Sequence, residues 1–427
     1  MLIAASAVML IIGTLYSWAI FTQPLLVLFH WNLTTATFAF AVANFSLATV
    51  GAVVGGFWLD RAGPRKVALV GISLWGVGNL LAGLGTPSFG AVWLYFTYGV
   101  TGGIGAGMAY VTPLAVVSKW FPDKRGLAGG LVTGSFALGA FVYNQCIPRL
   151  THFHAAAIHA ADLIATRVVV TGLTPEVAAT DMDAVMQVFI ASGVAFLVIG
   201  LPAAWVLRDP PRGDGSAQSA FAAADTGYPP SKVVVMPQFY LLWLQLFANA
   251  IAGLSIISNA VPLLADLTNM SPALIASLFG TVSLFNAVGR FLWGSLSDRI
   301  GCNRTFAALF ALQAVTLVLL GHTHDLTGAL AGISVVLLCC GGGFGTMPSY
   351  NAQYFGTKYM GLNYGLMLSA WGFAGLIGPI LLARARDLSG SYAAILSTMA
   401  IGLLFAVILP LITRKPEAKP EAAPIVS

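Results

Sequence analysis

The chain has 427 residues, of which 58% are hydrophobic and only 8% are charged, and its mean hydropathy is +0.86. Soluble domains carry about 25% charged residues, so this composition excludes a soluble globular fold and favours a membrane protein. The net charge of +5 comes from basic residues in short segments between apolar runs, without interleaved aromatic residues, and this argues against a nucleic-acid partner.

Twelve apolar stretches follow one another along the chain, and each is long enough to cross a bilayer as a helix, which takes about 20 residues. Met1 leads almost directly into the first stretch, which lacks a basic start and a small-residue cleavage site, so we interpret it as a span rather than a signal peptide. The sequence therefore predicts an all-α membrane protein of twelve transmembrane helices, with spans near 3–29, 35–58, 67–86, 89–118, 127–148, 184–207, 238–264, 272–296, 304–321, 328–354, 361–383 and 391–412.

Two polar stretches interrupt this series. Residues 149–183 contain His152, His154 and His159 without clear metal-ligand spacing, so we expect a solvated external loop and no metal site. Residues 208–236 are rich in Pro, Gly, Ser and Asp, which is typical of a linker. The predicted domains are two six-helix bundles at 1–207 and 237–413, the cytoplasmic linker at 208–236 and a cytoplasmic tail at 414–427.

The loop charges predict the orientation in the plasma (inner) membrane. With both termini in the cytoplasm, four basic residues lie outside: Arg149, Arg167, Arg384 and Arg386. Fifteen lie on the cytoplasmic side, where the positive-inside rule expects them: Arg61, Arg65, Lys66, Lys119, Lys124, Arg125, Arg208, Arg212, Lys232, Arg299, Arg304, Lys358, Arg414, Lys415 and Lys419.

The loop after the second span is repeated after the eighth. Residues 56–66 read GFWLDRAGPRK and residues 294–304 read GSLSDRIGCNR, so both fit G-x-x-x-D-R-x-G-x-x-[RK] at an offset of 294 − 56 = 238 residues. A weaker echo relates residues 119–126 to residues 354–361. Motifs at equivalent places in two six-helix halves imply a pseudo-two-fold transporter built around a central cavity.

This duplicated loop resembles the signature of the major facilitator superfamily, and the resemblance covers essentially the whole chain. It implies that the motif residues latch helix ends at the cytoplasmic face and stabilise one access state. The expected gating residues are Asp60, Arg61, Asp298 and Arg299.

A narrower resemblance rests on three segments: Tyr16-Ser17-Trp18, the sequence KWFPDKRG at 119–126, and the sequence NAVGR at 286–290. They are similar to the oxalate/formate antiporter family, which is related to the monocarboxylate transporters. In that family the arginine that matches Arg290 binds the substrate carboxylate.

Arg290 also stands out without this resemblance. It is the one basic residue placed inside a span, and none of the 15 acidic residues lies mid-span. An arginine deep in a bilayer is expensive and usually faces a cavity or a partner. A guanidinium offers a carboxylate two parallel hydrogen bonds, so a transient anion is one partner. The alternative is an arginine that snorkels or donates to backbone carbonyls between helices.

Two departures from the related families bear on the substrate. Asn286 lies one turn before Arg290, where animal monocarboxylate transporters carry a proton-coupling Asp. Asn does not titrate, so a co-transported proton would have to use the substrate or a peripheral group. Trp371 stands in an A-x-G context where oxalate carriers carry a lysine, and one buried positive charge suits a monoanion. The alternative is that Trp371 only packs and another group meets oxalate.

Aromatic and amide side chains in the spans complete the predicted pocket. Each has packing as its alternative role. The candidates are Tyr16, Tyr110 and Tyr350 as hydroxyl donors, and Tyr143 and Asn144 in the fifth span. The glycine-rich runs at 102–107 and 341–345 lie inside spans and predict close helix packing, and no P-loop is present, so neither ATP drive nor a cofactor is expected.

The sequence therefore predicts a secondary transporter, not an enzyme, that moves a small organic anion across the bilayer by alternating access. A monocarboxylate such as lactate, pyruvate or formate is preferred. The alternatives are an oxalate/formate exchanger, a facilitator of neutral or cationic compounds, and a carboxylate-sensing membrane receptor without flux. An embedded Asp or Glu, which a cationic substrate would usually need, is missing from the spans.

Overall fold

The computed structural model describes residues 1–31, 33–150, 175–210, 227–268, 282, 284–389 and 392–416. Within these ranges the chain is helical, and the only extended pairing is an isolated bridge between Gly227 and Gly356. The predicted all-α fold is confirmed. Most of the predicted external loop, including its three histidines, and most of the linker lie outside the described residues.

The first half contains six membrane-crossing segments, several of which are broken into shorter helices. They are built from α1 (Leu2–Gly13), η1 (Thr14–Ser17), α2 (Ala19–Leu28), α3 (Leu33–Ser46), η2 (Leu47–Gly51), α4 (Ala52–Ala62), α5 (Pro64–Leu94), η3 (Tyr95–Gly102), α6 (Gly103–Trp120), η4 (Pro122–Lys124), α7 (Arg125–Leu150) and α9 (Pro175–Val206).

The second half follows the short helix α11 (Pro230–Val233). Its helices are α12 (Pro237–Thr268), α14 (Leu284–Ile300), α15 (Cys302–Leu320), α16 (Leu326–Phe355), α17 (Met360–Ser389), α18 (Tyr392–Ala406) and α19 (Ile408–Ile412).

Nine helices of the described chain are long and apolar enough to cross a membrane, and they account for most of the twelve predicted spans. The longest, Pro64–Trp120, contains two spans joined at Gly90, whose φ of 70° is accessible because glycine has no Cβ. Span one is interrupted by the 3-10 turn η1, and α14 is described over 17 residues only. Together these segments make the twelve-helix membrane protein.

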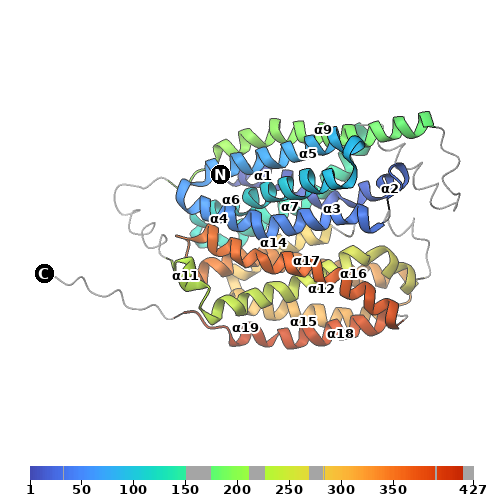
Figure 1. Cartoon of the computed structure of the whole chain (residues 1–427). Helices are drawn as coiled ribbons and strands as arrows, with labels where there is room; N and C mark the ends of the chain where they lie inside the picture. Colours follow the sequence, from blue (N-terminus) through green and yellow to red (C-terminus); the bar gives the residue numbers. More distant parts are fainter. Residues whose placement is uncertain are drawn as a thin grey trace.

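The two halves lie side by side, the first half at the top and the second at the bottom of Figure 1. They meet along two helix pairs, α7 with α14 and α4 with α17, which are related by the internal repeat. At one end of the molecule α4 and α14 end while α7 and α17 begin. We call this end the latch end; it lies at the left of Figure 1, where α11 is labelled.

Candidate functional site

Arg290 lies on α14 at the contact between the two halves. It is only 2% exposed, and among the described residues it is the one charged side chain that is buried. Its backbone carbonyl is in close contact with Gly130 of α7 and Gly345 of α16, where a methyl group on either glycine would collide with the oxygen. The helix that carries Arg290 is therefore held between a helix of the other half and a helix of its own.

The guanidinium has two hydrogen-bond partners. Nε donates to Oδ1 of Asn286 at 3.2 Å, and Nη1 donates to the backbone oxygen of Thr133 at 3.1 Å. Asn286 in turn donates to the Leu337 oxygen at 3.4 Å, so it orients the guanidinium. A guanidinium has five N–H donors, and the described chain engages two of them, which leaves three.

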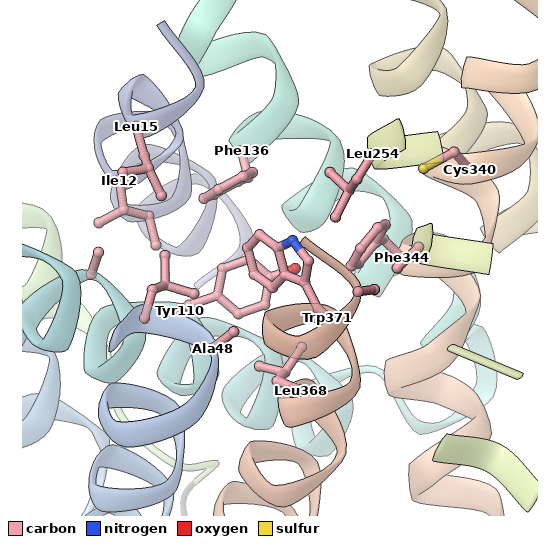
Figure 2. Packing of buried hydrophobic residues seen from close by; sticks show 14 of the residues in the cluster. Ile12, Leu15, Ala48, Tyr110, Phe136, Leu254, Cys340, Phe344, Leu368 and Trp371 are labelled. Atoms are coloured by element: carbon pink, nitrogen blue, oxygen red, sulfur yellow. The ribbon is translucent and has the colours of Figure 1, made fainter. Parts of the chain in front are cut away.

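Aromatic rings from both halves surround this guanidinium. Its Cζ lies 5.1 Å from the ring centre of Phe344 and 5.5 Å from that of Phe136. The indole of Trp371 lies between these two rings, at 5.4 Å and 6.0 Å, and Tyr110 packs at 5.5 Å from it. Figure 2 shows Trp371 at the centre, with Tyr110 beside it and Phe136 and Phe344 on its two sides. Tyr16 adds a fifth ring, 6.1 Å from Trp371.

Polar atoms of the same rings have no hydrogen-bond partner within the described chain. They are the hydroxyls of Tyr16 and Tyr110 and Nε1 of Trp371. The Tyr16 hydroxyl nevertheless lies beside Trp371, and the Tyr110 hydroxyl lies beside both Arg290 and Tyr364 without forming a well-aligned bond. Buried polar groups are normally satisfied, so this cluster of unsatisfied donors is the candidate site of the described chain.

The protein partners of Arg290 change how its burial is explained. On insertion scales, placing an arginine at the centre of a membrane helix costs a free energy of about 3 kcal/mol. A hydrogen bond to a charged group contributes roughly 1.5–3 kcal/mol and a desolvated cation–π contact about 2 kcal/mol. The two hydrogen bonds and two cation–π contacts of Arg290 together offset this insertion cost. Arg290 thus lacks a carboxylate partner in the described chain, as expected, but it does form the backbone contact between helices that was the alternative role.

Two predicted pocket residues, Tyr143 and Tyr350, do not join this cluster. The Tyr143 hydroxyl is paired with Ser192 at 2.7 Å, and its ring packs in the first half near Phe196. Tyr350 packs on Phe306 and Tyr354 in the second half. Neither ring contacts Trp371 in the described structure, because each belongs to the interior of one half and not to the surface between them. The side chain of Asn144 lies outside the described residues.

The sequence analysis missed Phe136, Phe344 and Thr133. Thr133 contributes only its backbone oxygen, which no side-chain pattern can indicate. The two phenylalanines are among 26 in the chain. Spans that are apolar on every side give no hydrophobic stripe from which an inward-facing ring could be identified. One signal was available: Phe136 follows Gly130 and Phe344 precedes Gly345, the two glycines at which α7 and α16 come close to Arg290.

The close approach at Gly130 leads to a stability prediction. We expect Gly130→Ala to destabilise the protein by about 1–3 kcal/mol, because the added methyl meets the Arg290 carbonyl, a backbone atom that cannot move aside cheaply. Its neighbour provides a matched control. A methyl on Gly129 would have its nearest contact at 3.6 Å, so Gly129→Ala should be neutral or slightly stabilising. Thermal unfolding in detergent compares the two, and equal melting temperatures would rule out the tight contact.

At the latch end the two motif aspartates reach across to the opposite half. Asp60 of α4 accepts hydrogen bonds from the backbone nitrogens of Gly361 and Leu362, both at 3.0 Å. Asp298 of α14 accepts from those of Gly126 and Leu127, both at 2.8 Å. Each carboxylate therefore lies at the N-terminus of a helix of the other half, where the backbone N–H groups and the helix dipole favour negative charge.

The motif arginines have no such role in the described structure. Arg61 is exposed and lies over the ring of Phe57, 3.7 Å from its centre, and Arg299 is exposed near the end of α14. The weaker sequence echo is also explained. Gly126 and Gly361 close the echoed segments, and each provides one of the two backbone nitrogens that donate to an aspartate.

Comparison with known proteins agrees with this architecture. The profile described as Major Facilitator Superfamily matches residues 2–347 and 242–426, which together cover nearly the whole chain. The chain belongs to the major facilitator superfamily. It is therefore a multi-pass membrane transporter of small molecules rather than an enzyme.

Within this superfamily the transporter is similar to proteins with carboxylates in their names. It is 26% identical to the oxalate:formate antiporter of Oxalobacter formigenes over 380 residues, 88% of this chain and 82% of that protein. It is 25% identical to apicoplast pyruvate carrier 1 of Toxoplasma gondii, over 78% of this chain and 67% of that protein. Monocarboxylate transporter 9 of Pongo abelii is 30% identical over 126 residues only.

Solved structures confirm the fold of the transporter. The proton:xylose symporter XylE superposes with a TM-score of 0.74 at 13% identity, covering 97% of this chain and 96% of that one. A variant of the E. coli fucose:proton symporter FucP superposes with a TM-score of 0.70 at 12% identity, covering 97% of this chain and 98% of that one. Their substrates are sugars, so these likenesses bear on the fold and not on the cargo.

Proposed function

We propose that this transporter carries small monocarboxylate anions by alternating access, and that Arg290 binds the carboxylate group. The observation that carries the proposal is the group of buried donors without well-aligned acceptors around Arg290 and Trp371. Three guanidinium N–H groups, the Trp371 Nε1–H and the hydroxyls of Tyr16 and Tyr110 lie in this cluster without a well-aligned acceptor in the described chain, and no acidic side chain is buried there to compete. Such a set of donors matches an anion with two adjacent oxygens.

The names of the relatives support the same class of cargo. Oxalate, formate, pyruvate and monocarboxylates share the carboxylate group and differ in size and charge. A cationic cargo would leave Arg290 repelling its substrate. Oxalate/formate exchange remains the second candidate, because the similarity to the antiporter extends over most of the chain.

The charge balance favours a monoanion over oxalate. Arg290 supplies one positive charge, and its aromatic neighbours are neutral. The second charge of a dianion would stay uncompensated in a site of low dielectric constant, where charges interact strongly and desolvation is costly. Trp371 offers an N–H donor but no charge. We therefore assign Trp371 the role of selecting monoanions.

This role predicts the effect of Trp371→Lys. A second cation should raise binding of oxalate relative to formate by at least about tenfold, the equivalent of 1.4 kcal/mol. Trp371→Phe is the matched control, because it removes the N–H and adds no charge, and it should weaken formate binding without favouring oxalate. Competition of each acid against labelled formate uptake provides the ratio. An unchanged ratio in Trp371→Lys would remove Trp371 from the selection of substrate charge.

The latch end is the cytoplasmic end in this proposal, with both termini in the cytoplasm of the plasma membrane. The concentration of loop arginines and lysines at this end supports that orientation. Asp60 and Asp298 then act as gating residues that hold the cytoplasmic ends of the two halves together, and their release opens the path inwards. Arg61 and Arg299 contribute to the orientation through their charge rather than through the latch.

Proton coupling, if present, does not use a carboxylate next to Arg290. Asn286 occupies that position and accepts the hydrogen bond from Nε, and an amide does not titrate. A co-transported proton would therefore travel on the substrate or use a peripheral group.

A ligand screen tests the proposed class of cargo. The purified transporter should be stabilised against heat by formate, pyruvate or L-lactate, because a ligand that binds only the folded protein raises its stability. Lipophilic cations should have no effect. Uptake of the stabilising acid into proteoliposomes separates a transporter from a sensor, which binds without flux. Stabilisation by cations alone would refute the proposal.

A further inference from the structure

The guanidinium of Arg290 is stabilised by groups from both halves of the transporter. Phe136 and the Thr133 oxygen belong to α7 of the first half, while Phe344 and Asn286 belong to α16 and α14 of the second. The two rings and two oxygens are permanent parts of the protein. The stabilisation of this charge is therefore present whether or not an anion is bound.

We propose that Phe136 and Phe344 are positioning residues that allow the transporter to close over Arg290 without cargo, so that it catalyses net transport and not only exchange. This inference rests on the proposed function. An exchanger must be unable to reorient while unloaded, and a bare buried charge imposes that restriction, because closing the site would strip water from it. Two aromatic faces and two oxygen acceptors replace that water, and Phe136 and the Thr133 oxygen do so as the halves come together.

The distances of the Phe136 and Phe344 rings from the guanidinium indicate that they stabilise its charge and do not only fill space. Both lie within 5.5 Å of Cζ, inside the distance of about 6 Å at which the ring quadrupole attracts a cation. Phe136 and the Thr133 oxygen reach Arg290 from the opposite half, so these contacts form only when the halves are together, and the Phe344 contact, within the half that carries Arg290, strengthens as the closing site loses water. The favourable effect of the two rings is thus largest in the closed state, and a contact changes an equilibrium only through such a difference between states.

Leucine substitutions separate the charge interaction from packing. Phe136→Leu and Phe344→Leu keep an apolar side chain and remove the ring face. Proteoliposomes are loaded with labelled formate, pyruvate or L-lactate in parallel, with the membrane potential clamped by valinomycin and potassium. Efflux is measured into buffer without the acid, which reports net transport, and into buffer with the unlabelled acid, which reports exchange.

In the wild type we expect net efflux within a few-fold of exchange for any acid that is carried. In each leucine variant, net efflux should fall at least about tenfold while exchange stays within about threefold, because a bound carboxylate still neutralises Arg290. Phe310→Leu is the control: Phe310 is buried in α15 against Phe306, and its replacement should leave the ratio of the two rates unchanged.

Two results would overturn the inference and leave the proposed function standing: exchange without net efflux in the wild type, or equal loss of both rates in the leucine variants. Absence of both rates in the wild type for all three acids would instead refute the proposed function, and the inference with it. Retained exchange in the variants also shows that they are folded.

Discussion

Arg290→Gln should reduce carboxylate uptake by about 100-fold or more while the protein stays folded. Removing one partner of a buried, hydrogen-bonded charge pair costs about 2–5 kcal/mol, and each 1.4 kcal/mol is a factor of ten in affinity. Glutamine keeps a polar group at the end of a shorter side chain but has no charge and no guanidinium fork. Initial uptake rates in proteoliposomes, together with the melting temperature, measure the effect.

Two further variants make this result interpretable. Arg290→Lys keeps the charge and loses the planar pair of donors, so it should retain a fraction of the activity. Arg208→Gln removes an exposed arginine after α9 and should have no effect. Loss of uptake in Arg290→Gln accompanied by unfolding would indicate a structural role, in which its contact with Thr133 merely holds α14 against α7.

Asp60→Asn and Asp298→Asn should each release the latch. Each of these two carboxylates accepts two backbone hydrogen bonds from the opposite half. A hydrogen bond to a charged group contributes roughly 1.5–3 kcal/mol of stabilisation. Asparagine keeps the size of the side chain and loses its charge. The population of the state in which the latch end is closed should therefore fall by a factor of about ten or more. Uptake should fall accordingly.

Hydrogen exchange detects this release directly. Peptides containing the four donating amides, at residues 126–127 and 361–362, should exchange faster in either variant, because the two halves part as units. Asp325→Asn is the matched control. Asp325 caps α16 through Gly328 within its own half, at 2.7 Å, so its loss should leave both peptides and uptake unchanged. Wild-type exchange in both aspartate variants would mean that these carboxylates do not hold the halves together.

The sequence predicted the fold well because the spans carry strong and independent signals. Apolar stretches of bilayer length, short loops and a repeated motif all led to twelve helices in two related halves, and helices begin and end within a few residues of the expected places for most spans. The differences lie where the chain bends without charged residues. Gly90 joins two spans with a single residue of positive φ, and η1 breaks span one at Thr14–Ser17, where the sequence carries no charge.

The site was predictable where a residue type is costly in a membrane. Arg290 attracts notice in any apolar span, and Asn286 follows from helix geometry as its neighbour one turn away. Tyrosines are different, because a phenol is tolerated both in packed interiors and at a ligand site. Tyr16 and Tyr110 lie in the cluster around Trp371, whereas Tyr143 and Tyr350 pack inside the separate halves, and only the three-dimensional arrangement distinguishes the two pairs.

Counterflow of labelled L-lactate, with L-lactate or L-lactamide as competitor, tests most directly whether a carboxylate is what Arg290 recognises. The two competitors have nearly the same shape, and only one carries the charge. We expect unlabelled lactate to suppress counterflow at concentrations where the amide has no effect, and Arg290→Gln to abolish the signal. Equal competition by the neutral amide, or counterflow at the wild-type rate in Arg290→Gln, would contradict the central role of this arginine.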